Sequence, residues 1–384
     1  MNDQYEGAVS EARLSEARLP HAEPASAIEV TEEDDKGSDR SAEGTVSSRD
    51  ARGEDTGIEA HPHSRFNVLI PRSRQLTTLW TLLLVFVVQC IVFGTINSRF
   101  ASLANAQTIG YEVSFNVILA VGTTAAMISN TLDISFAAIA GLSGVLVAVL
   151  ATHAGLPLVI AIVIALMVSI LVGLANGIIS VFVGVPPFIV TLAMLFIAYG
   201  VQLEVTSGNV IPVSGGLFHE VAAGYLGPLP LPVIYAVLVA VAGGYWLRRT
   251  VSGAHVSEIG SNEEASYVFG IRVSWVRIAV LTVQSGLAGI VGVLFTAELS
   301  SATPSLGSTR LLTVIAAVVL GGTSLFGGEG SIIGSVIGVL FIGTLQDGLV
   351  LIGVNPDLEY LVTGLFLMLA VVAQFLSRRG DHAR

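Results

Sequence analysis

The sequence predicts an all-α, polytopic membrane protein that follows a disordered N-terminal tail. Two observations support this fold class. First, 53% of the 384 residues are hydrophobic, only 12% are charged, and the mean hydropathy is +0.77, whereas soluble domains carry about 25% charged residues. Second, apolar runs recur at the length of about 20 residues that a helix needs to cross a bilayer. An ordinary soluble domain is therefore excluded.

The acidic residues are concentrated near the N-terminus. The formal net charge is −11, but residues 1–64 contain 16 Asp or Glu and six Lys or Arg, so the rest of the chain is almost neutral. A segment with so few large apolar residues cannot bury enough surface to offset its ordering entropy. We therefore interpret residues 1–75 as an acidic disordered tail. A solvated spacer is the simplest interpretation of this tail, and a docking site for a partner is the alternative.

No signal peptide is visible before the first apolar run. Residues 76–378 are predicted to form a transmembrane domain of about ten spans, with the eighth interrupted by glycines. The expected spans are 77–97, 112–130, 134–153, 156–183, 187–206, 230–247, 275–297, 311–326, 331–352 and 358–377.

Positive charge near the span ends predicts the orientation, because cytoplasmic loops are enriched in Lys and Arg. With the N-terminus in the cytoplasm, nine arginines fall inside and only Arg99 and Arg310 fall outside. Both termini are then cytoplasmic. The arginines expected inside are Arg72, Arg74, Arg248, Arg249, Arg272, Arg277, Arg378, Arg379 and Arg384.

The polar segment 252–277 is the longest connection on the predicted cytoplasmic side. Ser261 followed by Glu264 is a capping-box pattern that predicts the start of a short helix. Gly270 is a natural stop for this helix, because glycine accepts the left-handed conformation that ends many helices. We therefore expect a helix of about two turns in the middle of the loop.

This short helix is expected to be amphipathic. Helical spacing places Ala265, Val268 and Phe269 on one face and Glu263, Glu264 and Ser266 on the other. Such a helix becomes stable when its apolar face docks into a groove of a soluble protein. The alternative is a helix that lies on the lipid surface, but two glutamates facing an anionic leaflet argue against it.

The chain cannot hydrolyse ATP through a P-loop, because that loop needs a lysine to reach the phosphates. The only lysine is Lys36, which lies in the acidic tail after two aspartates. The sequence contains no constellation of metal ligands and no nucleophile with a neighbouring base.

A few polar residues and glycines in the spans are candidates for a path through the membrane. A charge at bilayer depth costs at least about 2.5–3.5 kcal/mol, so such residues are usually functional. Asp133, however, is followed by Ser135 and is also suited to cap the next helix. The glycines around 321–330 allow either close helix packing or an irregular backbone that lines a pathway.

Four segments carry a resemblance to a known family. The run from Ile315 to Gly334, IAAVVLGGTSLFGGEGSIIG, is the most specific. Similar segments are Gly260–Ile271, Leu299–Pro304 and Pro187–Leu192. Together they resemble the ribose/xylose-type sugar permeases of bacterial ABC importers, over roughly residues 77–378. Departures from the family pattern occur at Thr131–Ala138, which contains Asp133, and at Arg310–Thr313.

The resemblance implies a homodimeric permease subunit of the bacterial inner membrane, which is not itself an enzyme. Its implied partners are a pair of cytoplasmic ATPase subunits, which would bind ATP, and a substrate-binding protein outside. The loop between the sixth and seventh spans would act as the coupling element, through Ser261, Glu263, Glu264, Ala265, Val268, Phe269 and Gly270. The candidate residues for the translocation path are Asp133, Ser135, Thr191, Gln202, Gly321, Gly322 and Thr323.

The expected function is therefore import of a monosaccharide driven by a partner ATPase. Importers of nucleosides, polyols or branched-chain amino acids use related permeases and stay open as alternatives. A self-sufficient secondary carrier or channel is the alternative from another class. A membrane scaffold acting through the acidic tail is a third and weaker one.

Overall fold

The computed structural model describes residues 72–304, 307, 310–355 and 357–382, which belong to one compact unit, Val68–Arg384. The predicted acidic tail, residues 1–75, lies almost entirely outside the described residues and stays a prediction. Among the described residues the chain is helical, with only two pairs of two-residue strands. The all-α prediction is confirmed.

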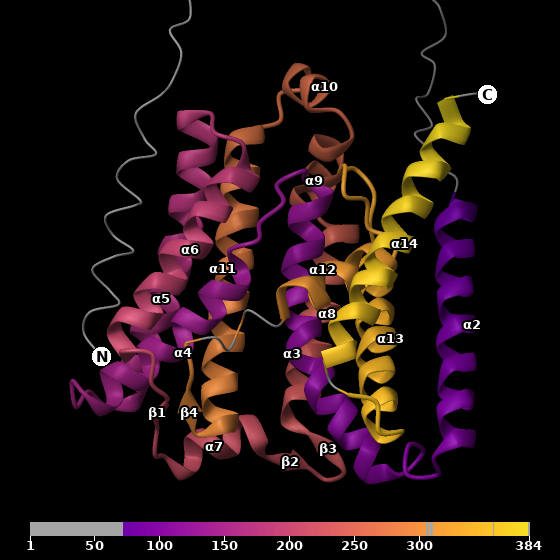
Figure 1. Ribbon diagram of the computed structural model, residues 1–384. Helices are drawn as coiled ribbons and strands as arrows, with labels where there is room; N and C mark the ends of the chain where they lie inside the picture. Colours follow the sequence, from indigo (N-terminus) through magenta and orange to yellow (C-terminus); the bar gives the residue numbers. More distant parts are fainter. Residues whose placement is uncertain (1–71, 305–306, 308–309, 356, 383–384) are drawn as a thin grey trace, which may run out of the picture. The chain divides into compact units, whose positions relative to one another are not determined.

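Each of the ten predicted spans coincides with a helix (Figure 1). Seven of these helices are long and apolar enough to cross a membrane, whereas α4, α12 and the apolar part of α14, Leu361–Val372, are shorter. The ten helices are α2 (Arg72–Ile96), α3 (Leu103–Ile128), α4 (Phe136–Thr152), α5 (Leu158–Ile178), α6 (Pro187–Thr206), α8 (Leu231–Arg249), α11 (Val273–Leu299), α12 (Arg310–Leu320), α13 (Ile332–Leu351) and α14 (Asp357–His382).

The core forms around α3, which packs against α8, α11, α12 and α13. Every residue of α3 from Val113 to Ile128 is buried. A helix that is apolar all round needs neighbours on every side, which explains why this span has no lipid-facing stripe over that length. The outer surface of α5 and α6 is instead rich in exposed apolar side chains, as expected for a surface in contact with lipid.

Glycines allow α4 and α11 to approach closely. A Cβ atom on Gly292 of α11 would collide with the backbone carbonyl of Ala140 on α4, and one on Gly144 of α4 would lie 3.0 Å from the carbonyl oxygen of Gly292. The small-residue packing that is typical of membrane helices therefore operates at this crossing.

Replacing Gly292 with alanine is expected to lower the free energy of unfolding by about 1–3 kcal/mol, because the added methyl group overpacks the α4–α11 crossing. Gly200→Ala is the matched control, since its Cβ would meet no atom within 4 Å and alanine is the better helix former. Thermal unfolding of the two purified variants in detergent checks the difference. Equal melting temperatures would contradict the packing account.

Short elements occupy the two ends of the unit (Figure 1). One end, called the α7 end, carries α7, the paired strands β1 and β4, and the paired strands β2 and β3. The other, called the α10 end, carries α9 and α10. Their bounds are α7 (Gly216–Ala223), β1 (Ile211–Pro212), β4 (Ser301–Ala302), β2 (Tyr225–Leu226), β3 (Leu229–Pro230), α9 (Val251–Ser261) and α10 (Glu263–Val268), with a π-helical turn, η1 (Ile179–Val183), extending α5.

The predicted break in the eighth span is confirmed. Helix α12 ends at Leu320, and helix α13 begins only at Ile332. Between them Gly322, Gly327 and Gly328 have φ angles of 87°, 83° and 79°, a region that costs other residues about 1–2 kcal/mol. The segment 321–331, called the broken segment below, therefore depends on glycine for its backbone path.

Candidate functional site

Helix α10 is the predicted docking helix, but its N-terminal cap differs from the prediction. The Oδ1 atom of Asn262 accepts a hydrogen bond from the backbone N–H of Ala265 at 2.9 Å. Ser261 instead ends α9, and its hydroxyl donates to the carbonyl of Ser257 at 2.8 Å. The assignment of the cap to Ser261 was wrong because α9 continues to that residue, and the next residue, an asparagine, caps equally well.

The predicted stop at Gly270 is confirmed. Gly270 has a φ of 78°, and its N–H donates to the carbonyl of Tyr267 at 3.0 Å, while the N–H of Ile271 donates to that of Ser266 at 3.0 Å. This pair of bonds is the Schellman motif that closes a helix on a left-handed residue. Helix α10 is thus capped at both ends.

Removing the Asn262 cap is expected to destabilise α10 locally by about 1 kcal/mol, which corresponds to amide exchange in α10 that is about fivefold faster. The change tested is Asn262→Ala, and hydrogen exchange of residues 263–270 read by mass spectrometry measures it. Ser261→Ala is the matched control and should leave this exchange unchanged. Equal effects of the two substitutions would contradict the assignment of the cap.

An ion pair fixes α10 to α11. The two guanidinium nitrogens of Arg277 donate to the two carboxylate oxygens of Glu263, each at 2.8 Å. A bidentate pair of this kind sets both distance and orientation. The sequence pattern placed Glu263 and Ser266 on the polar face, opposite the apolar one. The structure shows that Glu263 anchors the helix and that Ser266 is buried, with its hydroxyl donating to the carbonyl of Asn262.

Helix α10 lies beyond the ends of the membrane helices (Figure 1), and its apolar side chains are exposed. Val268 is 85% exposed and Phe269 is 83% exposed, with Tyr267 also exposed beside them. Ala265 is half-buried and Glu264 is exposed. Single exposed apolar residues are normal, but three consecutive large ones at a capped helix make this a candidate interaction surface.

Helix α9 connects this surface to the core. Val256 and Ile259 of α9 are buried, and Val256 belongs to one hydrophobic cluster with Ile128 of α3 and Val280 of α11. A Cβ atom on Gly260 would collide with the carbonyl of Ile128 and approach the backbone of the broken segment. Helix α9 is therefore seated on the end of α3 without a gap.

The broken segment touches both α3 and α9. The N–H of Gly328 donates to the carbonyl of Ile128 at 2.8 Å. A Cβ atom on Gly327 would lie 2.9 Å from the carbonyl oxygen of Gly260 and 2.9 Å from the Cβ of Asn130. The break in the eighth span and α9, the helix that precedes the docking helix, thus meet at one backbone junction.

The predicted path residues around Asp133 form one buried cluster at the start of α4. The Oδ1 atom of Asp133 accepts from the N–H and the hydroxyl of Ser135, both at 2.6 Å, and Asn176 of α5 donates to the same hydroxyl at 3.0 Å. The side chain of Asp133 therefore fixes the turn before α4, but Asp133 is not the N-cap: that residue is Ser135, and its side chain makes no capping hydrogen bond. The Oδ2 atom of Asp133 and the Oδ1 atom of Asn176 are buried without a hydrogen-bond partner among the described residues.

Thr191 belongs to this cluster, whereas Gln202 does not. The hydroxyl of Thr191 is buried and accepts from the N–H of Ile134 at 3.4 Å. Gln202 lies three turns further along α6, which is about 16 Å at the rise of an α-helix. Its Nε2 atom donates to the carbonyls of Ala138 and Ala198, each at 3.0 Å, so it joins α6 to α4.

Gly321, Gly322 and Thr323 lie in a different place, between α3 and α13. The hydroxyl of Thr323 lies 3.3 Å from that of Ser335, which in turn accepts from Thr124 of α3 at 2.7 Å. A Cβ atom on Gly321 would collide with the backbone of α13. The structure therefore divides the predicted path residues among three places: the Asp133 cluster at the start of α4, the contact of Gln202 between α6 and α4, and the broken segment.

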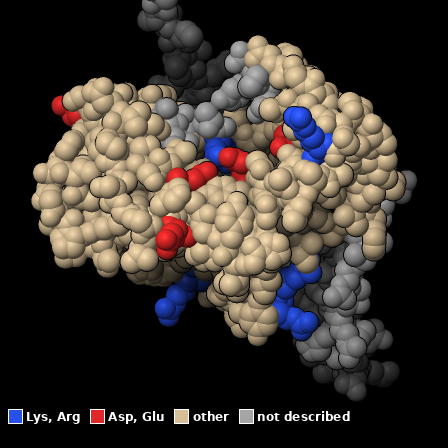
Figure 2. Space-filling view, turned by 90° about the horizontal axis from the view of Figure 1, so that it is seen from below, with Lys and Arg blue, Asp and Glu red and all other residues tan. Residues whose placement is uncertain are grey.

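A third polar cluster lies at the α7 end and was not predicted as a site. Arg310 donates to Glu112 at 2.9 Å and to Asn116 at 3.2 Å, and its guanidinium group lies 4.3 Å from the centre of the Phe295 ring. Figure 2 shows acidic side chains gathered near the middle of this face around a basic one. The available signal was the presence of Glu112 and Glu298 within apolar helices.

Comparison with known proteins gives a consistent result. Residues 105–371 match the family described as "Branched-chain amino acid transport system / permease component". The chain is 38% identical over 284 residues to the ribose import permease protein RbsC of Bacillus subtilis, covering 73% of this chain and 88% of that protein. It is 31% identical to the L-arabinose ABC transporter permease protein AraH of Azospirillum brasilense (75% and 86% covered) and 30% identical to the D-allose transport system permease protein AlsC of Escherichia coli (73% and 86%).

No solved structure matches the chain. The family match spans most of the helical unit, from the start of α3 to near the end of α14, and therefore includes the docking helix and the broken segment. The relatives are transport subunits and not enzymes. The chain belongs to the permease-component family of the branched-chain amino acid transport system type, and it is a multi-pass inner-membrane transport subunit.

Proposed function

We propose that this chain is the permease subunit of an ATP-driven ABC importer for a monosaccharide. Two copies form the translocation path, and both termini lie in the cytoplasm. A cytoplasmic ATPase subunit binds and hydrolyses ATP, and an external binding protein delivers the solute. The names of relatives that import ribose, L-arabinose and D-allose support the sugar class. A nucleoside, a polyol or a branched-chain amino acid are the other solutes to test.

The observation that carries this proposal is the exposed apolar face of α10. Val268 and Phe269 are held outside the membrane helices by a helix that is capped at both ends and tied to α11 by Arg277. Pre-organisation lowers the ordering cost of binding, so a partner with an apolar groove gains affinity from this surface. The ATPase subunit is the soluble partner that an importer needs on that side.

The expected orientation of the chain in the membrane also supports docking of the ATPase at α10. Arg248, Arg249, Arg272 and Arg277 belong to α8, α11 or the connection between them at the α10 end, whereas Arg99 and Arg310 lie at the helix ends nearest the α7 end. The α10 end is therefore the cytoplasmic one by the positive-inside rule. The α7 end faces the binding protein.

The contacts of α9 and α10 connect the proposed ATPase docking surface to the membrane helices. Force on α10 reaches α11 through the Glu263–Arg277 pair, and it reaches α3 and the broken segment through Gly260. Rigid helices joined by close backbone contacts transmit a displacement instead of absorbing it. ATP-driven closure of the partner would then switch the Asp133 cluster at α4 and the site at Gly321, Gly322 and Thr323 between outward and inward access.

Reconstitution tests the proposal against a self-sufficient carrier or channel. The full chain is placed in proteoliposomes alone, or together with an ABC ATPase subunit and a binding protein from the same organism, and uptake of labelled ribose, arabinose and allose is measured. We expect uptake only with all three proteins and ATP on the ATPase side. Uptake by the chain alone, driven by an ion gradient without ATP, would overturn the proposal.

A further inference from the structure

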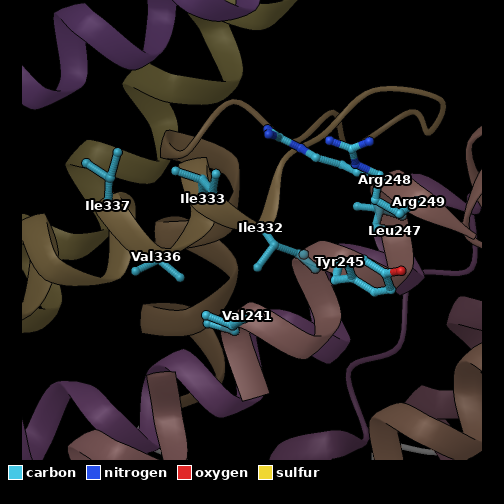
Figure 3. A pocket seen from close by; sticks show the side chains of 11 residues that line it. Val241, Tyr245, Leu247, Arg248, Arg249, Ile332, Ile333, Val336 and Ile337 are labelled. Carbon is cyan, nitrogen blue, oxygen red and sulfur yellow. The ribbon is translucent and has the colours of Figure 1, made fainter. Parts of the chain in front are cut away.

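A lateral groove between α8 and α13 is not used by the proposed transport function. It has a volume of about 450 Å³, and Figure 3 shows the side chains that line it. Val241, Tyr245 and Ile333 of its lining are exposed, and both helices are long and apolar enough to span a membrane, so lipid is the surrounding that we assign to this groove. Its lining residues are Ala240, Val241, Gly244, Tyr245, Leu247, Arg248, Arg249, Ile332, Ile333, Val336 and Ile337.

The groove has two chemically different parts. Most of its wall is aliphatic, from Val241 to Ile337, whereas Arg248 and Arg249 lie together at one end, away from Val241 (Figure 3). None of the lining residues is acidic. The two guanidinium groups therefore give this end a net positive charge that the wall does not neutralise.

The arginines differ in how they are held. Arg248 donates a hydrogen bond to the hydroxyl of Ser331 at 3.1 Å. Arg249 is exposed and makes no hydrogen bond or ion pair with any residue that the structure describes. One arginine is thus positioned and the other is free to turn toward a ligand.

The depth of the groove matches a membrane interface. The arginines lie in the last turn of α8, and the lining residues extend back to Ala240. The helical rise from Ala240 to Arg249 is about 14 Å, which is roughly half the thickness of the hydrocarbon core, or one leaflet. The charged end therefore lies at the headgroup level while the apolar wall reaches into the leaflet.

We propose that this groove binds one anionic phospholipid. Its phosphate is held by Arg248 and Arg249, and an acyl chain lies against Val241, Ile333 and Val336. Two cations without an acidic neighbour complement a phosphate, and basic pockets between spans recognise anionic headgroups in this way. The binding measured below does not depend on which solute is carried or on whether α10 docks an ATPase.

The bound lipid would act on the broken segment. Ser331, the partner of Arg248, caps α13 by accepting from the N–H of Gly334, and it is the last residue before that helix. A headgroup that engages Arg248 competes for the same guanidinium group. A lipid bound in the groove would therefore weaken the contact between Arg248 and Ser331, and Ser331 belongs to the broken segment on which the proposed coupling depends.

Native mass spectrometry of the purified full-length chain in detergent tests this site, with phosphatidylglycerol and phosphatidylcholine as the two probes. We expect retention of phosphatidylglycerol over phosphatidylcholine. Arg249→Gln should weaken phosphatidylglycerol binding about fivefold, since one arginine near the surface contributes about that factor. Arg272→Gln is the matched control, an exposed arginine at the α10 end that does not line the groove, and it should change nothing.

A second variant blocks the apolar part. Gly244→Leu places a side chain in open space, because a Cβ atom there meets nothing within 4 Å, and it should lower retention of the lipid while both arginines remain. Its melting temperature reports folding. Unchanged phosphatidylglycerol binding in both Arg249→Gln and Gly244→Leu would overturn the proposal. If Gly244→Leu abolished dimerisation, and if dimerisation of the unmodified chain did not depend on phosphatidylglycerol, the proposal would also be overturned. The groove would then be a contact with a second copy of the chain.

Discussion

Replacing Phe269 with aspartate is expected to abolish coupled transport while leaving the membrane unit folded. Phe269 is 83% exposed, so the substitution breaks no packing within the chain. A carboxylate in the proposed apolar groove of the ATPase would be buried without a partner. Central aromatic residues of an interface are worth about 2–4 kcal/mol, so we expect sugar uptake to fall at least about thirtyfold.

The measurement is ATP-dependent uptake in proteoliposomes, together with ATP hydrolysis stimulated by the loaded binding protein. Phe269→Leu is the matched variant, since it keeps an apolar side chain at the same position, and it should retain most of both activities. Thermal unfolding should be the same for Phe269→Asp and the unmodified chain. Unchanged uptake in Phe269→Asp would show that α10 does not dock the ATPase.

Replacing Gly327 with alanine is expected to separate docking from transport. Gly327 has a φ of 83°, and its added methyl group would lie 2.9 Å from the carbonyl oxygen of Gly260. The left-handed conformation costs about 1–2 kcal/mol for alanine, and the close approach adds about 1–3 kcal/mol of overpacking. The junction between the broken segment and α9 should therefore shift, although the surface of α10 is intact.

Gly353→Ala is the control for this substitution. Gly353 has nearly the same φ, 82°, but a Cβ atom there would meet nothing within 4 Å. Both variants carry the backbone cost, and only Gly327→Ala disturbs the junction. We expect uptake per ATP hydrolysed to fall about tenfold further in Gly327→Ala, while co-purification with the ATPase is retained. An equal loss of uptake per ATP hydrolysed in the two variants would show that the junction does not take part in coupling.

The spans were predictable because length and hydropathy are local properties of the sequence. Each expected span coincides with a helix, and the glycines after Leu320 correctly predicted the break in the eighth. The shorter α4 was overestimated at its start, because Asp133 and Ser135 form a hydrogen-bonded turn before the helix begins. An apolar window does not detect such a turn.

The position and the exposed apolar residues of the docking helix were predictable, but the ion pair that attaches it to α11 was not. The apolar spacing of Val268 and Phe269 gave the exposed surface. The pair between Glu263 and Arg277 joins residues 14 positions apart, so no helical periodicity indicates it. Both serine and asparagine favour an N-cap, and only the continuation of α9 to Ser261 decides between them.

The sequence identified single polar residues inside the membrane, but it did not show which of them lie together. Thr191 and Gln202 stand on the same helix, yet one joins the Asp133 cluster and the other holds α6 against α4. The cluster around Arg310 draws on α3, α11 and α12. Such combinations depend on which helices are neighbours, and a single sequence does not contain that information.

Site-specific cross-linking tests the central claim most directly. Val268→Cys and Leu217→Cys, each in a Cys90→Ser background, place one thiol on α10 and one on α7 at the opposite end, at side chains that are 85% and 81% exposed. In the active complex, a short thiol-to-amine reagent should join Val268→Cys to the ATPase subunit and should not join Leu217→Cys to it. A cross-link from Leu217→Cys, or none from Val268→Cys in a complex that still transports, would contradict the account.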